Sequence, residues 1–231
     1  MTKDQVRARI VEIGIVAAVR VYSEEDALFT AEAIVEGGIP VVEIPLTVPK
    51  ATDVISRLAK NIPSIIVGAG GVRLLATARK CLDAGALFLT SDGMHPAVIE
   101  YAALEEIVAI PGALTPTEVM AAWEARSDFV KVVPCAHIGG ESYILSLSRM
   151  FPHIPLIAAG GVNQQNASNF IIAGATGLGI GRELMPAEAI RHRKLDRIGE
   201  LARRFLGFVK AGRDHLAARA SRVPDKDVAR G

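Results

Sequence analysis

Lys131 is the residue most able to do chemistry, because it stands in an otherwise apolar segment, 129–134. A buried ammonium ion is costly unless it is paired or loses its proton. Desolvation therefore favours the neutral amine of a buried lysine. Such an amine attacks ketones to form a Schiff base. The competing interpretation is a strand-end lysine whose ammonium extends into water.

Glu43 is the acid expected to work with this lysine. It lies in a second apolar run, 41–46, and side chains alternate along a strand, so Glu43 and Pro45 share one face. Opposite charges inside an apolar interior pair or share a proton. We expect Glu43 to pair with Lys131 and to act as general acid and base. The alternative is a buried counter-ion without a catalytic role.

Two arginines and several glycines are candidates for holding an anion. Arg20 lies near the end of the first apolar run, and Arg182 directly follows Gly181 at the end of the last one. Gly160 and Gly161 end the run before it, so backbone N–H groups and a guanidinium would converge on an anion there. The alternatives are a rim charge for Arg20 and a surface ion pair with a nearby glutamate for Arg182.

Eight short apolar runs, separated by longer helical patterns, must position these residues. Runs covered on both faces and alternating with helices are typical of parallel βαβ units. Eight units in 231 residues predict a single (β/α)₈ barrel whose site lies at the carboxyl ends of the strands. An open doubly wound sheet is the alternative, but no glycine-rich phosphate turn follows Val21. The runs are 15–21, 41–46, 65–70, 87–91, 107–112, 129–134, 155–160 and 177–181.

Helix signals define the ends of the barrel. Thr2 with Gln5 predicts a short helix before the first strand, placed to plug the bottom of the barrel. Thr115 and Glu118 predict a capping box, and Asn163 is expected to cap a helix beginning near residue 164. We expect one barrel domain over 1–213, followed by a polar, arginine-rich tail over 214–231 that is frayed or contacts another subunit.

Composition excludes several classes of function. The net charge is +1, and half of the residues are apolar, so neither nucleic acid nor a membrane is an expected partner. Cys81 and Cys135 fit neither a zinc site nor a disulfide framework, which suits the reducing cytoplasm. The polar N-terminus is not a signal peptide. No metal-binding motif or dinucleotide fingerprint is present.

Several ordered segments resemble the class I pyruvate aldolases that act on 2-keto-3-deoxy-6-phosphogluconate and 4-hydroxy-2-oxoglutarate, including the phosphogalactonate branch. The resemblance implies a barrel, a Schiff-base lysine at Lys131 and an acid/base glutamate at Glu43. It also implies a homotrimer, no cofactor, and reversible cleavage of a 2-keto-3-deoxy acid, with or without a 6-phosphate, to pyruvate and an aldehyde. The segments that carry it are 42–49, 66–70, 111–118, 130–134 and 159–162.

The substrate-holding positions depart from this family. Gly71 replaces a threonine, Asp92 a proline, Val133 a phenylalanine and Ala159 a threonine, and Arg182 stands where a phosphate-binding serine is usual. Arg182 either binds phosphate itself or meets a terminal carboxylate. Since Asp92 would repel a keto-acid carboxylate, a non-catalytic barrel that binds a small anion is the rival hypothesis. The substrate-binding candidates are Arg20, Thr47, Gly71, Asp92, Val133, Gly160, Gly161, Gly181 and Arg182.

Overall fold

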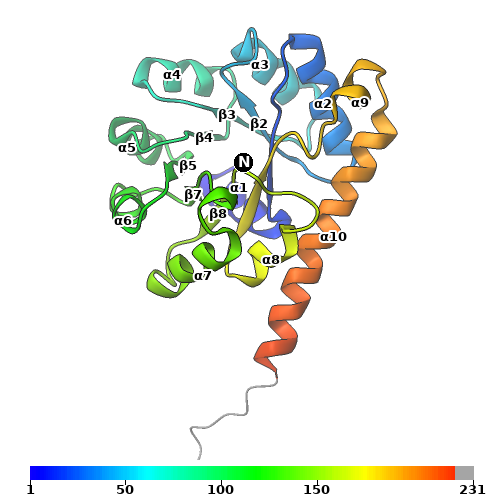
Figure 1. Ribbon diagram of the computed structural model, residues 1–231. Coiled ribbons are helices and arrows are strands. Elements are labelled where there is room, and N and C mark those ends of the chain that lie inside the picture. The colour runs from blue at the N-terminus through cyan, green and yellow to red at the C-terminus, as the bar shows by residue number, and fades with distance from the viewer. Residues whose placement is uncertain (222–231) are drawn as a thin grey trace, which may run out of the picture.

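The computed structural model describes residues 1–221, and it is a barrel of parallel strands inside a ring of helices (Figure 1). Apolar strands buried on both faces favour this arrangement, because helices cover the outer face and side chains fill the interior. The strands are β1 (Ile15–Ala18), β2 (Val41–Pro45), β3 (Ile66–Gly70), β4 (Phe88–Thr90), β5 (Val108–Ile110), β6 (Gly112–Ala113), β7 (Val130–Val132), β8 (Leu156–Ala159) and β9 (Gly177–Ile180).

The strand order is β5-β4-β3-β2-β1-β9-β8-β7-β6, and all the pairings are parallel. The predicted fifth strand is divided at Pro111 into β5 and β6, because proline has no N–H to donate. The Lys131 N–H nevertheless donates to the Pro111 carbonyl at 2.8 Å, and the Phe129 N–H to the Ala109 carbonyl at 3.3 Å. The barrel is therefore closed, and the predicted fold is confirmed.

Helices follow the strands around the outside. The long helix α10 packs against α2 and α8. Within residues 1–221, no helix has the length and apolar character needed to cross a bilayer. The helices are α1 (Lys3–Ile13), α2 (Glu24–Glu36), α3 (Ala51–Asn61), α4 (Leu75–Asp83), α5 (Pro96–Leu104), α6 (Pro116–Glu124), α7 (Gly140–Met150), α8 (Ala167–Ile172), α9 (Ala187–Arg191) and α10 (Leu195–Ala220), with a 3₁₀ turn, η1 (Ala136–Ile138).

The helix signals were largely correct. Capping boxes begin α1 at Thr2 and α6 at Thr115. The expectation for Asn163 was wrong, because α8 begins at Ala167. The Asn163 Oδ1 atom instead accepts from the Gln165 N–H at 2.9 Å and orders the turn before that helix.

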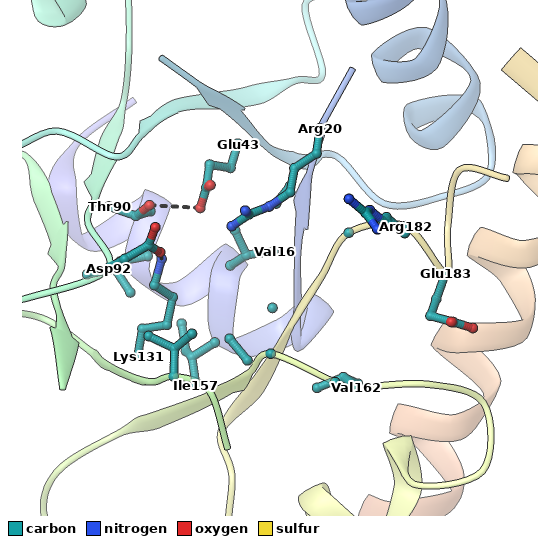
Figure 2. A pocket seen from close by; sticks show the side chains of 18 of the residues that line it. Val16, Arg20, Glu43, Thr90, Asp92, Lys131, Ile157, Val162, Arg182 and Glu183 are labelled. Carbon is teal, nitrogen blue, oxygen red and sulfur yellow. Dashed lines mark hydrogen bonds and ion pairs between the residues drawn. The ribbon is translucent and has the colours of Figure 1, made fainter. Parts of the chain in front are cut away.

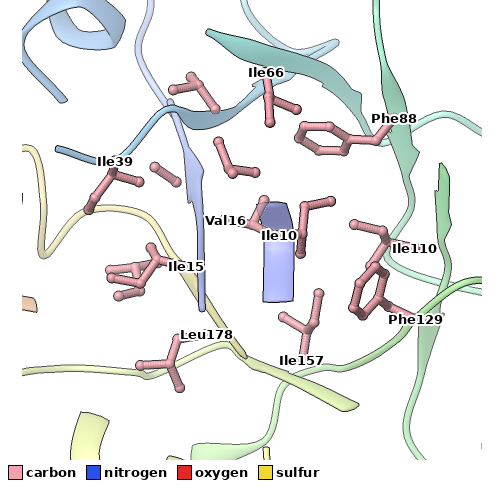
Figure 3. Packing of buried hydrophobic residues seen from close by; sticks show 14 of the residues in the cluster. Ile10, Ile15, Val16, Ile39, Ile66, Phe88, Ile110, Phe129, Ile157 and Leu178 are labelled. Carbon is pink, nitrogen blue, oxygen red and sulfur yellow. The ribbon is translucent and has the colours of Figure 1, made fainter. Parts of the chain in front are cut away.

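The core fills the barrel and the layer beneath the helices. Ile10 of α1 is 1% exposed and lies among strand residues such as Val16 and Ile157 (Figure 3). α1 contacts β2, β5 and β9, so this helix lies across the barrel interior. The amino-terminal end of the barrel is closed, and the carboxyl ends of the strands remain open to ligands.

The predicted tail begins inside a helix. Residues 214–220 continue α10, and residues 222–231 lie outside the described part of the chain. Upstream of this segment, Arg213 donates to the carbonyls of Glu12 and Val11 at 2.6 and 2.5 Å, tying α10 to the end of α1.

Candidate active site

A cavity of ≈ 510 Å³ opens at the carboxyl ends of the strands, where the barrel geometry places an active site. It is lined by side chains from β2, β4 and β7 and by the turns after β1, β4, β8 and β9 (Figure 2). Lys131 and Glu43 both line it, although they lie on strands far apart in sequence.

Lys131 is only 6% exposed, and its ammonium group reaches the cavity from β7. Its Nζ atom lies 3.0 Å from Oδ1 of Asp92, which follows β4. The neighbours of Lys131 along β7 are Val130 and Val132, both fully buried. Apolar side chains of Ile110, Val133 and Ile157 line the cavity with Lys131, and among residues 1–221 only the Asp92 carboxylate lies within 4.0 Å of its Nζ atom.

Glu43 is 4% exposed and points into the same cavity from β2. Its Oε2 atom accepts a hydrogen bond from the Thr90 hydroxyl at 2.8 Å. In the described chain it makes no ion pair within 4.0 Å with Lys131, so the predicted Lys131–Glu43 pair is wrong. Asp92 takes that place because the turn after β4 brings its carboxylate over β7.

Three cations surround Asp92 and balance its charge. Partial burial raises the pKa of Asp92, but the charge and hydrogen bond of Lys131 and the charges of Arg20 and Arg73 outweigh that effect. The pKa of this carboxyl therefore lies below its usual range. Asp92 is ionised at neutral pH and does not present an isolated negative charge to an incoming anion.

Arg20 and Arg182 are exposed and line the cavity. Arg20 extends toward the side that holds Glu43, whereas Arg182 lies apart near the end of β9 (Figure 2). Within residues 1–221 neither guanidinium lies within 4.0 Å of a carboxylate. The alternative interpretation of Arg182, a surface ion pair with a nearby glutamate, is therefore not observed in the described chain.

The other substrate-binding candidates divide between two spaces. Val133, Gly160, Gly161 and Gly181 line the main cavity. Thr47 and Gly71 line an adjoining cleft of ≈ 550 Å³, which shares Arg20, Glu43 and Asp92 with it.

Sequence reasoning missed Thr90, Asn163 and Arg73. Thr90 and Asn163 line the cavity, and Arg73 lines the adjoining cleft. A signal for Thr90 was available: it is the polar end of an apolar strand and shares the inward parity of Asp92. Among residues 1–221, no three His, Cys, Asp or Glu side chains are grouped so that they could hold a metal ion.

Comparison with known proteins places the chain among aldolases. Residues 6–201 match the model of the KDPG and KHG aldolase family. A probable 2-dehydro-3-deoxy-6-phosphogalactonate aldolase from Rhizobium meliloti (strain 1021) is 31% identical over 198 residues, covering 83% of this chain and 93% of the relative. The KHG/KDPG aldolase of Escherichia coli (strain K12) is 30% identical over 189 residues, and the match covers 82% of this chain and 89% of that relative.

Solved structures agree with the sequence matches. The KDPG aldolase from Legionella pneumophila, with pyruvate captured at low pH as a covalent carbinolamine intermediate, superimposes with a TM-score of 0.79. It is 28% identical, and the match covers 86% of this chain and 97% of that one. A structure described as native KDPGal superimposes with a TM-score of 0.80 at 26% identity, and the match covers 87% of this chain and 96% of that one. The chain belongs to the KDPG and KHG aldolase family.

Proposed function

We propose that the protein is a class I aldolase that reversibly cleaves a 2-keto-3-deoxy acid into pyruvate and an aldehyde. The observation that carries this proposal is Lys131, an almost fully buried lysine whose Nζ atom reaches a cavity at the carboxyl ends of the barrel strands. An amine in such surroundings is a nucleophile for ketones. The covalent carbinolamine of pyruvate in the Legionella relative supports the same chemistry.

The reaction begins when Lys131, after it gives up one proton, attacks the C2 ketone through its nitrogen lone pair, and loss of water gives an iminium ion. Glu43 then takes the proton of the C4 hydroxyl as the C3–C4 bond breaks. The bonding electrons move into the iminium, which becomes an enamine, and the aldehyde leaves. Glu43 returns its proton to C3, and hydrolysis releases pyruvate. The Thr90 hydroxyl supports this role because its 2.8 Å hydrogen bond fixes the Glu43 carboxylate.

The substrate is anionic at one or both ends. Arg20 extends toward the Glu43 side of the cavity and is suited to the keto-acid carboxylate. Arg182 is suited to a distal phosphate or carboxylate, because it lines both this cavity and a neighbouring groove of ≈ 670 Å³. Val133, Gly160, Gly161 and Gly181 line the same cavity.

The rival hypothesis of a non-catalytic anion-binding barrel was supported by the lost substrate-holding hydroxyls and by the repulsion expected from Asp92. That repulsion is offset, because Lys131, Arg20 and Arg73 act on the same carboxylate. Ligand-induced melting shifts without adduct formation or turnover would favour the rival.

Borohydride trapping tests the proposal. The protein is incubated with pyruvate and borohydride, and peptide masses are measured. We expect a reduced pyruvate adduct on Lys131 and none on Lys210, an exposed lysine of α10. The absence of label on Lys131 would refute the mechanism. Glu43→Gln should leave adduct formation measurable but lower turnover by ~10²–10⁴-fold, the usual range for a general acid–base group.

A substrate panel tests the distal contact. Arg182→Ala should slow cleavage of keto acids with a distal phosphate or carboxylate and spare neutral ones, since only the former meet the guanidinium. Arg197→Ala is the control, because Arg197 is exposed on α10 and pairs with Glu200. Equal losses on charged and neutral substrates would argue against an anion contact, and comparing phosphorylated with carboxylated substrates identifies the preferred end group.

We also propose a homotrimer acting in the cytoplasm. Both cysteines are free and buried, which suits a reducing compartment, and the family resemblance implies trimers. Light scattering should give the mass of three 24.5 kDa protomers. A monomeric mass would refute the trimer.

A further inference from the structure

Asp92 is the carboxylate closest to the reacting nitrogen. Its Oδ1 atom lies 3.0 Å from Lys131 Nζ, within hydrogen-bond distance. The Lys131 side chain is 8% exposed, whereas the Asp92 side chain is 63% exposed. The carboxylate is therefore the more exposed member of the pair, and it contacts the buried amine from the solvent-accessible side.

The turn that carries Asp92 is fixed by two local features. The Ser91 hydroxyl donates to the Gly93 carbonyl at 2.6 Å, which closes the turn over Asp92. Gly112 of β6 has no side chain to obstruct it: a Cβ there would lie 2.4 Å from the Asp92 carbonyl carbon and 2.8 Å from the Gly93 nitrogen. The backbone of the turn thus packs directly on the strand beside β7.

Glu43 and Asp92, two of the three carboxylates that line the cavity, make different contacts. Glu43 accepts from Thr90, and Asp92 accepts from Lys131. One carboxylate thus lies at the nitrogen that forms the Schiff base. The other accepts from Thr90, two residues before Asp92, and in the described chain makes no ion pair with that nitrogen within 4.0 Å (Figure 2). Asp92, and not Glu43, is therefore the group in position to exchange protons directly with Lys131 Nζ.

We propose that Asp92 is a second catalytic carboxylate, which carries protons from Lys131 to the ketone oxygen during Schiff-base formation and leaves carbon–carbon cleavage to Glu43. This inference rests on the proposed function.

The proton balance closes without any other group. The Lys131 ammonium has three N–H protons, and the iminium nitrogen keeps one. Asp92 takes the first proton, and the freed lone pair forms the N–C bond while the carbonyl π electrons move to oxygen. Asp92 delivers this proton to that oxygen. It then takes a second proton from the nitrogen and delivers it to the hydroxyl, which leaves as water. Asp92 ends as a carboxylate.

The first transfer is uphill, because a carboxylic acid is a stronger acid than an ammonium ion. Attack of the neutral amine on the carbonyl carbon consumes the product of this unfavourable transfer and so drives the equilibrium toward the adduct. The second transfer is easier, because the adduct nitrogen is bonded to a carbon that carries an electron-withdrawing oxygen. The charged and titratable groups that line the two spaces around the pair are Glu43 from β2, Arg20 and Arg73 from the turns after β1 and β3, His95 before α5, and Arg182 and Glu183 after β9. The nearby arginines keep Asp92 ionised and ready to accept.

Asp92→Asn separates this role from that of a simple counter-ion, because the two predict opposite changes. The probe is pyruvate, and the rate of adduct formation is measured by quenching with borohydride at successive times. A proton carrier requires the rate to fall, by ~10²-fold or more. A counter-ion that only stabilises the ammonium predicts a faster rate near neutral pH, since its removal frees the amine. An unchanged or faster rate would overturn the proposal.

Three further variants sharpen the result. Glu43→Gln should keep the adduct rate and lose cleavage, the reverse order of effects. Asp92→Glu should recover part of the rate. Asp83→Asn is the matched control, because Asp83 is exposed at the end of α4, away from the cavity. If Asp92→Asn does not fold, Asp92→Ser repeats the test. An unlabelled wild-type protein refutes the proposed function itself, whereas a labelled wild type with a fast Asp92→Asn variant refutes this inference alone.

Discussion

Replacing Gly70 with alanine should displace Glu43 without touching Lys131. Gly70 ends β3 beside the Glu43 side chain. A Cβ at this position would lie 2.2 Å from Glu43 Oε1, 2.6 Å from Cδ and 2.8 Å from Cγ, whereas ordinary contacts of a Cβ lie at 3.4–4 Å. The backbone of Gly70 does not have a positive φ, so the conflict with Glu43 is the main effect of the substitution.

The carboxylate must move by about 1 Å to relieve this contact, and a misplacement of that size is enough to lower the rate by ~10²-fold. The movement also disturbs the 2.8 Å hydrogen bond from Thr90. We expect kcat for aldol cleavage to fall by ~10²-fold, while borohydride trapping of pyruvate on Lys131 continues at the wild-type rate. Single-turnover kinetics with a 2-keto-3-deoxy acid separates the two steps.

Gly207→Ala is the matched control, because Gly207 lies in α10 and a Cβ there meets nothing within 4 Å. Its activity should be unchanged, and its helix should be more stable by roughly 1 kcal/mol. If Gly70→Ala cleaved substrate within about twofold of the wild type, well short of the ~10²-fold loss, the placement of Glu43 would not limit catalysis. The role assigned to that residue would then be wrong.

Three further predictions concern the rest of the chain. Burial raises the pKa of Cys81 and Cys135 to about 11, so iodoacetamide near pH 8 should modify neither thiol in the folded protein, as intact mass will show. Hydrogen bonds from the Thr115 and Leu114 N–H groups lower the pKa of Glu118. The ionised carboxylate therefore stabilises the fold fully above its ordinary pKa, and this stabilisation is lost as pH falls through the lower folded-state pKa. Glu118→Gln should consequently lower the Tm measured by thermal melting at pH 7 but not in strong acid. Phe129→Ala should cost ~3–5 kcal/mol of unfolding free energy in urea, because that ring is fully buried.

The barrel could be predicted because its signals are local. Each strand is a short apolar run, and the chain repeats the same unit around a closed ring. The catalytic candidates could also be identified from the sequence. A charged side chain within an apolar strand is costly to bury, so its presence there indicates a partner or a function. Lys131 and Glu43 both lie where strand alternation placed them, facing the cavity.

The ion pair between Lys131 and Asp92 could not be predicted, because it depends on the conformation of the turn that carries Asp92. Alternation says which face a strand side chain takes, but Asp92 lies beyond β4 and reaches Lys131 through a turn that requires Gly112 opposite it. The division of the fifth strand into β5 and β6 could not be predicted from the apolar pattern either. Pro111 interrupts donation from one residue only, and the run around it remains apolar throughout.

The pairing of β1 with β9 has a consequence for the making of the protein. β1 leaves the ribosome among the first segments, and its second neighbour arrives only after most of the chain has been translated. Until then the nascent chain exposes an unpaired strand edge, which can recruit other polypeptides. Chaperone capture should therefore be strongest for chains stalled just before residue 177 and should fall sharply once β9 has emerged.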